Sequence, residues 1–108
     1  MQEIIKNLES GFYSSNTAGQ AADDLAILSG TYARTCSEIE EVLSRKPAIW
    51  LVLRDKAKSD TSAERAWENS PEGIKEMQLR FRMKAIEKMM SSLKSIISVA
   101  QNELLRTK

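Results

Sequence analysis

Three glutamates and one cysteine that lie close together are the side chains in this sequence best suited to chemistry. Glu38, Glu40 and Glu41 could bind a divalent cation weakly, but no second acidic cluster completes a metal site. Cys36 falls on the apolar flank of a predicted helix, where a buried and unreactive thiol is the simpler interpretation. The sequence has no histidine, which removes the commonest general base and metal ligand. We therefore predict that the protein is not an enzyme and that it has no cofactor and no metal site.

Basic side chains recur at intervals of four residues in the second half of the chain. Arg80, Lys84 and Lys88 would share one face of a helix, and three or four phosphate contacts would give weak, salt-dependent binding. Glutamates on the same side partly neutralise this row, so a solvated face is the simpler interpretation. We keep these three residues, together with Arg65, as candidate contacts to a partner or to nucleic acid. Any nucleic-acid binding is expected to be weak and non-specific.

The composition is that of one helical domain. The chain has 108 residues, a net charge of +1, only four glycines and only two prolines. A single cysteine excludes an internal disulfide and suits a reducing compartment. The N-terminus lacks the pattern of a signal peptide, and the longest apolar run, Ala48 to Leu53, is far shorter than the roughly 20 residues that span a bilayer. We expect a cytoplasmic protein that does not bind membranes.

The elements that must position these side chains are led by one long helix over residues 71–106. Ser70 is suited to the N-cap and Pro71 to the first helical position, and no glycine or proline follows Gly73. This helix has two adjacent apolar rows. The first row comprises Ile74, Met77, Phe81, Ala85, Met89, Ile96 and Ala100, and the second comprises Leu79, Met83, Ile86, Met90, Leu93, Ile97 and Leu104. A two-helix hairpin needs only the first row, so the second predicts a third covering element.

Shorter apolar periodicities predict the rest of an all-α fold. The predicted helices cover residues 2–13, 18–45, 47–57 and 62–68, with capping boxes that begin at Thr17 and Thr61. Pro47 either ends a helix that restarts there or kinks it. The run Ala48 to Leu53 is apolar on every side, and we expect it to be the most buried segment of the middle region. The predicted fold is a single domain, residues 1–108, in which helix 71–106 lies antiparallel to helix 18–45 as a coiled-coil-like hairpin or small bundle.

The apolar rows of the long helix also predict self-association. An exposed row would exceed the apolar patch that a monomer normally tolerates, and a symmetric dimer is the simplest cover. The residues expected at this interface are Leu93, Ile96, Ile97 and Leu104. In the competing arrangement, helix 2–13 folds back over the row through Ile4, Leu8 and Phe12.

One resemblance covers about residues 59–104. The chain resembles a family of small helical accessory proteins of tailed bacteriophages and prophages. The segments that carry the resemblance are Ser59-Asp60-Thr61-Ser62-Ala63-Glu64-Arg65-Ala66-Trp67-Glu68, Gly73, Lys84-Ala85-Ile86-Glu87-Lys88, Ser92-Leu93-Lys94 and Asn102-Glu103. The resemblance implies an accessory protein of phage DNA replication or recombination in a bacterial host cell, and it supplies no catalytic residue.

Two functions follow as expectations. The first is a non-enzymatic interaction module, encoded by a phage, that holds another phage or host protein, or a second copy of itself, in place. The alternative is a small phage inhibitor of a host defence protein, similar in action to anti-CRISPR proteins, which acts by direct binding. Gene neighbourhood separates the two, because recombination genes favour the first and anti-defence genes favour the second.

Overall fold

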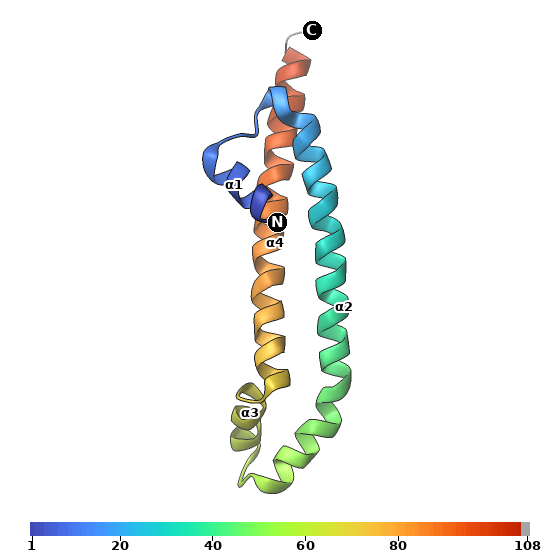
Figure 1. The fold of residues 1–108 in the computed structure, drawn as a ribbon, viewed down its shortest axis with the longest axis vertical. Helices are drawn as coiled ribbons and strands as arrows, with labels where there is room; N and C mark the ends of the chain where they lie inside the picture. The colour runs from blue at the N-terminus through green and yellow to red at the C-terminus, as the bar shows by residue number, and fades with distance from the viewer. Residues whose placement is uncertain (107–108) are drawn as a thin grey trace. The chain divides into compact units, whose positions relative to one another are not determined.

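The computed structural model describes residues 1–106, and every regular element in that range is a helix (Figure 1). The elements are α1 (Gln2–Ser10), the 3₁₀ helix η1 (Ser15–Thr17), α2 (Ala18–Lys56), α3 (Asp60–Glu68) and α4 (Pro71–Arg106). The predicted all-α class is confirmed, and the two long helices α2 and α4 pack against each other.

The contacts within the chain gather into two compact units, although the sequence predicts a single domain. Unit 1 comprises Met1–Ala33 and the described residues from Lys84 onward, and unit 2 comprises Arg34–Met83. Both α2 and α4 contribute a stretch to each unit, and in each unit the two stretches run in opposite directions (Figure 1).

The core of unit 1 joins α1 to the first half of α2 and the second half of α4. Leu28, Ile86 and Leu93 are fully buried at its centre. From α1, Ile4 is buried in the same cluster and Leu8 packs against it. A nine-residue helix is too short to be stable alone, so this packing is what holds α1 in place.

The core of unit 2 is built around one tryptophan of α3. Trp67 is buried with Ile39 and Val42 of α2 and with Leu79 of α4. Burial of a Trp side chain removes roughly 200 Å² from water, which makes this residue the largest single apolar contribution to the unit.

Pro47 lies inside α2, so the predicted separation into helices 18–45 and 47–57 is wrong. Proline has no N–H to donate to the Leu43 carbonyl one turn back, and this normally ends or kinks a helix. Here Ile49, Trp50 and Leu53, which follow the proline, pack against the core of unit 2. This packing stabilises the helix beyond Pro47 and offsets the lost hydrogen bond.

The apolar run after Pro47 is not the buried segment that the sequence predicts. Leu51 and Val52 are more than half exposed, and Ala48 is exposed as well. Only one side of a helix that lies on the surface of a unit can face its core. The side that carries Ile49, Trp50 and Leu53 is therefore partly buried, and the opposite side faces solvent.

In the N-terminal region the end of α1 and the position of one capping box differ from the prediction, whereas α2 begins at Ala18 as predicted. Instead of reaching Tyr13, α1 ends at Ser10, because Gly11 adopts the left-handed conformation (φ 70°) that terminates a helix. The predicted capping box at Thr17 is displaced by three residues. Ser14 is the capping residue, its Oγ accepts from the Asn16 N–H, and the Ser14 N–H donates to Thr17 Oγ1 at 2.7 Å.

Serine side chains cap the N-termini of both α3 and α4. The Ser59 Oγ accepts from the Ser62 N–H at 3.2 Å, so α3 begins at Asp60, two residues before the predicted start. The Ser70 Oγ accepts from the Gly73 N–H at 3.0 Å, and α4 has the bounds that the sequence predicts. The Ser70 cap fixes the point where the chain turns from α3 into α4.

Candidate functional site

The first turns of α4 present three large apolar side chains to solvent. Ile74 is 40% exposed, Met77 is 52% exposed and Phe81 is 64% exposed. They occupy positions i, i+3 and i+7, so they lie on one face of the helix within unit 2. We call these three residues the α4 anchor face. An exposed apolar patch is a candidate site for another molecule to bind.

This face belongs to the first apolar row, which the sequence assigns to the hairpin contact. In the structure the second row contributes Leu79, Ile86 and Leu93 to the buried residues of α4, and the first row contributes Met89 and Ala100. In unit 1 the first row is covered as well, since Met89 is buried in the cluster that contains Ile4 of α1. In unit 2 the described residues provide no such cover for Phe81, which is the most exposed residue of the face.

The basic side chains next to the anchors in sequence do not lie on the α4 anchor face. Lys75 and Arg82 directly follow Ile74 and Phe81, so they point about 100° further round the helix. Both are exposed, and among residues 1–106 the structure gives neither an ion pair. Arg80 Nε contacts Glu76 Oε2 at 2.8 Å. The face itself is therefore apolar.

A partly buried polar network joins α3 to α4 on the side opposite this face. Trp67 Nε1–H donates to Glu76 Oε1 at 3.1 Å, and Arg80 binds the other oxygen of the same carboxylate. Burial alone would raise the pKa of Glu76, but the hydrogen bonds from Arg80 and Trp67 outweigh it and lower this pKa below its usual value. The carboxylate thus stays ionised at neutral pH and supports the backbone that carries the anchor residues.

An open groove of about 390 Å³ lies beside Pro47 in unit 2, lined by Leu43, Lys46, Pro47, Trp50 and Glu64. Its polar groups are already paired with one another. Glu64 accepts from Trp50 Nε1–H at 3.2 Å and lies 3.5 Å from Lys46 Nζ, which also sits 5.1 Å from the centre of the Trp67 ring. No nucleophile or general base is free in this groove, so the arrangement stabilises the packing of α2 on α3.

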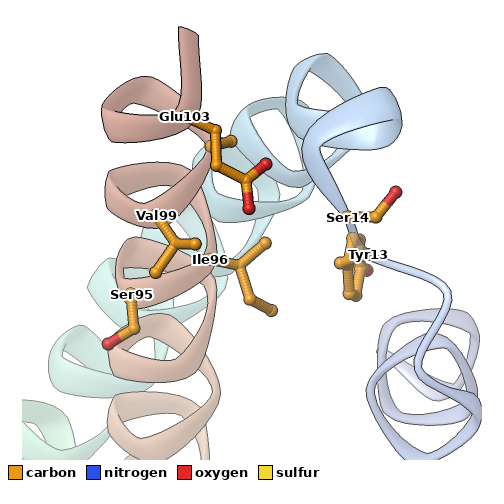
Figure 2. Close-up of a pocket in the computed structure, with 7 residues that line it drawn as sticks. Tyr13, Ser14, Ser95, Ile96, Val99 and Glu103 are labelled. Atoms are coloured by element: carbon orange, nitrogen blue, oxygen red, sulfur yellow. The ribbon is translucent and has the colours of Figure 1, made fainter. Parts of the chain in front are cut away.

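Unit 1 has a groove of about 330 Å³ between the segment after α1 and the end of α4 (Figure 2). Ile96 points from α4 toward Tyr13, and Glu103 lies above it at the rim. Behind the groove, the Tyr13 hydroxyl donates to Asp24 Oδ2 at 2.6 Å, and Gln20 donates to the other oxygen of that carboxylate at 3.0 Å. The only buried ionisable groups of this groove are therefore bound to each other.

Burial, followed by the hydrogen bond to Asp24, raises the pKa of Tyr13 from 10.0 to about 12. A raised pKa in the folded state means that the neutral hydroxyl stabilises the fold. This contribution is complete below pH 10 and is lost as the pH rises from 10 to about 12. Between pH 10 and about 12, we expect the free energy of unfolding to fall less for Tyr13→Phe than for the unchanged protein. Urea unfolding at pH 8 to 11.5 measures the difference, and an equal alkaline loss in both proteins would contradict the role of Tyr13.

The residues predicted for self-association do not form an exposed row. Leu93 is fully buried, and Ile96 and Ile97 are half-buried against the core of unit 1. Only Leu104 is largely exposed, at 61%. The helix that packs in this core is α1, so the competing arrangement is observed for Ile4 and Leu8, whereas Phe12 lies beyond the end of α1 and is 44% exposed. An interface through Leu93 is excluded because this side chain is not accessible.

The predicted basic contacts are all exposed. Arg65 lies on α3, Arg80 lies on α4 in unit 2, and Lys84 and Lys88 follow on α4 in unit 1. Arg80 is neutralised by Glu76, which reduces the positive charge that the row can offer. Contact of these residues with nucleic acid stays a prediction.

The predicted acidic cluster is not assembled as a metal site. Among residues 1–106, no group of three or more acidic or cysteine side chains is placed to hold a metal ion. Glu41 is paired with Arg45 one turn later on α2. Cys36 is half-buried, and its Sγ lies 3.6 Å from the sulfur of Met83.

The sequence interpretation missed the α4 anchor face as a surface, because Ile74 and Phe81 fit the apolar periodicity as well as the buried residues do. The charge beside it gives no signal, because the buried Leu79 and Leu93 are directly followed by Arg80 and Lys94 as well.

Comparison of the chain with protein-family models, with curated proteins and with solved structures gives no match. No helix among residues 1–106 combines the length and apolar composition needed to cross a membrane.

Proposed function

We propose that this chain is a non-enzymatic interaction module that binds another protein through the α4 anchor face. The single observation that carries the proposal is the exposure of Ile74, Met77 and Phe81 on one side of a helix whose opposite side is buried. Apolar residues at i, i+3 and i+7 are the anchors with which one helix binds a groove or a second helix. The rigid support behind them, from Trp67 to Glu76, favours binding because little order is lost on association.

The resemblance of residues 59–104 to phage accessory proteins supports a place for this module in phage DNA replication or recombination, in the cytoplasm of the bacterial host. A host or phage protein is then the partner, and self-association to a dimer stays a prediction. The second candidate, an inhibitor of a host defence protein, uses the same surface and differs only in what it binds.

Affinity capture from host lysate, with and without the phage genes, tests this proposal. The unchanged protein and Phe81→Glu are used side by side, because the variant places a charge in the centre of the anchor face at an exposed position. We expect at least one protein to be retained by the unchanged chain and reduced at least tenfold with the variant. A replication or recombination protein supports the first function, and a defence protein supports the second.

The matched control is Lys94→Glu, which also introduces a glutamate at an exposed position of α4 but outside the anchor face. It is expected to retain the same proteins as the unchanged chain. Identical capture with Phe81→Glu and with the unchanged chain would contradict the proposed function.

A further inference from the structure

We propose that the groove of unit 1 between Tyr13 and the end of α4 binds a lysine or arginine side chain of a partner protein. The aliphatic stem of that side chain lies on Ile96 and Val99, and its cation contacts Glu103. This site goes beyond the proposed function, because the α4 anchor face belongs to unit 2 and every residue that lines the groove belongs to unit 1.

One wall of the groove is a face of α4 that is apolar along its length and charged at its end. Ile96, Val99 and Glu103 stand at positions i, i+3 and i+7, so they lie within about 60° of one another round the helix. Val99 is 57% exposed, and Ile96 is half-buried. Figure 2 shows the Glu103 carboxylate beyond Ile96, directed toward the space between α4 and the segment that carries Tyr13. A ligand on this wall therefore meets apolar surface first and then a carboxylate.

The charge of the groove is negative. Glu103 is the only charged residue that lines it, it is exposed, and among residues 1–106 the structure gives it no ion pair. Behind Tyr13, the Asp24 carboxylate accepts hydrogen bonds from two neutral donors, the Tyr13 hydroxyl and the Gln20 amide. An anion would be repelled, and a neutral apolar ligand would take water from Glu103 without replacing its hydrogen bonds. A cation is the ligand whose charge complements the groove.

The shape of the groove favours a side chain of a protein over a free amine. Its volume of about 330 Å³ is at the low end for small-molecule sites, and such sites enclose most of their ligand, whereas this groove is open. Lysine and arginine side chains lay their stems on apolar surface and keep the charged end in water, which an open groove permits. Val99 and Glu103 are four residues apart, about 6 Å along the helix, a distance that the four-carbon stem of lysine spans. The backbone that carries this side chain would cover the exposed part of Val99.

NMR of the full chain, titrated with capped tripeptides, tests the proposal. The tripeptides have lysine, arginine or norleucine between two alanines, and norleucine supplies a similar stem without the charge. We expect the lysine and arginine tripeptides to shift the methyl signals of Ile96 and Val99 with a Kd of about 1–10 mM, as befits a single side chain. The norleucine tripeptide is expected to bind about fivefold more weakly, because an exposed ion pair contributes modestly.

Three variants of the chain separate the charge from the apolar wall. Glu103→Gln keeps the shape and removes the charge, so the basic tripeptides should bind it about as weakly as norleucine does. Val99→Ser should weaken all three tripeptides. Glu9→Gln is the matched control, because Glu9 is also exposed in unit 1, has no ion pair among the described residues and does not line the groove. It should bind as the unchanged chain does, and circular dichroism verifies that each variant keeps its helices.

Four results would overturn the proposal. Absence of shifts at Ile96 and Val99 would show that the groove binds no such side chain. Equal binding of the norleucine and lysine tripeptides would show that the groove selects apolar stems and not cations. Binding that Glu103→Gln leaves unchanged would place the cation elsewhere. Putrescine, a free diamine, is titrated in parallel, and tighter binding of putrescine than of the lysine tripeptide would make a free amine the ligand instead of a protein side chain.

Discussion

Gly73→Ala is expected to destabilise the protein by about 3 kcal/mol or more, because the added methyl group has no space. A Cβ atom at this position would lie 1.8 Å from the Trp67 carbonyl oxygen and 3.1 Å from the Glu68 Cα. Both are backbone atoms, so no change of rotamer relieves the overlap. The last turn of α3 or the first turn of α4 would have to move, and the Trp67–Glu76 hydrogen bond would be lost with it.

This expected loss of stability is opposite in sign to the effect of Gly→Ala at an ordinary helix position. Glycine in a helix interior costs about 0.5–1 kcal/mol relative to alanine, so Gly→Ala normally stabilises. Gly30→Ala in α2 is the matched control, because nothing lies within 4 Å of a Cβ atom built there. We expect urea unfolding, followed by circular dichroism, to show a lower midpoint for Gly73→Ala and a slightly higher one for Gly30→Ala. Equal shifts would show that the close approach at Gly73 is absent.

The helix starts that the sequence predicts correctly depend on local chemistry. Pro71 and the cap at Ser70 specify the start of α4 without any tertiary contact. Pro47 shows the limit of this reasoning. A local rule ends the helix there, whereas the packing of Ile49 and Trp50 on the core of unit 2 extends it.

The candidate site was less predictable than the fold, for a physical reason. Two apolar rows on one helix are equivalent in sequence, and only the packing of other elements decides which is buried. In unit 1, α1 packs on the core that contains both Met89 and Leu93. In unit 2, α3 inserts Trp67 beside Leu79 instead, and Phe81 is left exposed. The sequence alone cannot place α1 and α3 along α4, so it cannot locate the anchor face.

The two tryptophans illustrate the same point, because the sequence favours both as core residues and the structure separates them. Trp67 is 2% exposed and is buried in one cluster with Ile39, Val42 and Leu79. Trp50 is half-buried and forms a wall of the open groove beside Pro47. A residue that lines an open groove leaves little cavity when it is truncated, since water can enter the space.

Trp67→Ala is therefore expected to cost about 4 kcal/mol of unfolding free energy, within the range for truncation of a buried aromatic residue, and Trp50→Ala about 1–2 kcal/mol. If Trp67→Ala does not fold, Trp67→Phe supplies the measurement. It keeps most of the packing and removes the donor to Glu76, which should cost about 1–3 kcal/mol because a mostly buried carboxylate loses a partner. Urea unfolding of the three variants at neutral pH gives these values. An equal loss for Trp67→Ala and Trp50→Ala would show that the core of unit 2 is not centred on Trp67.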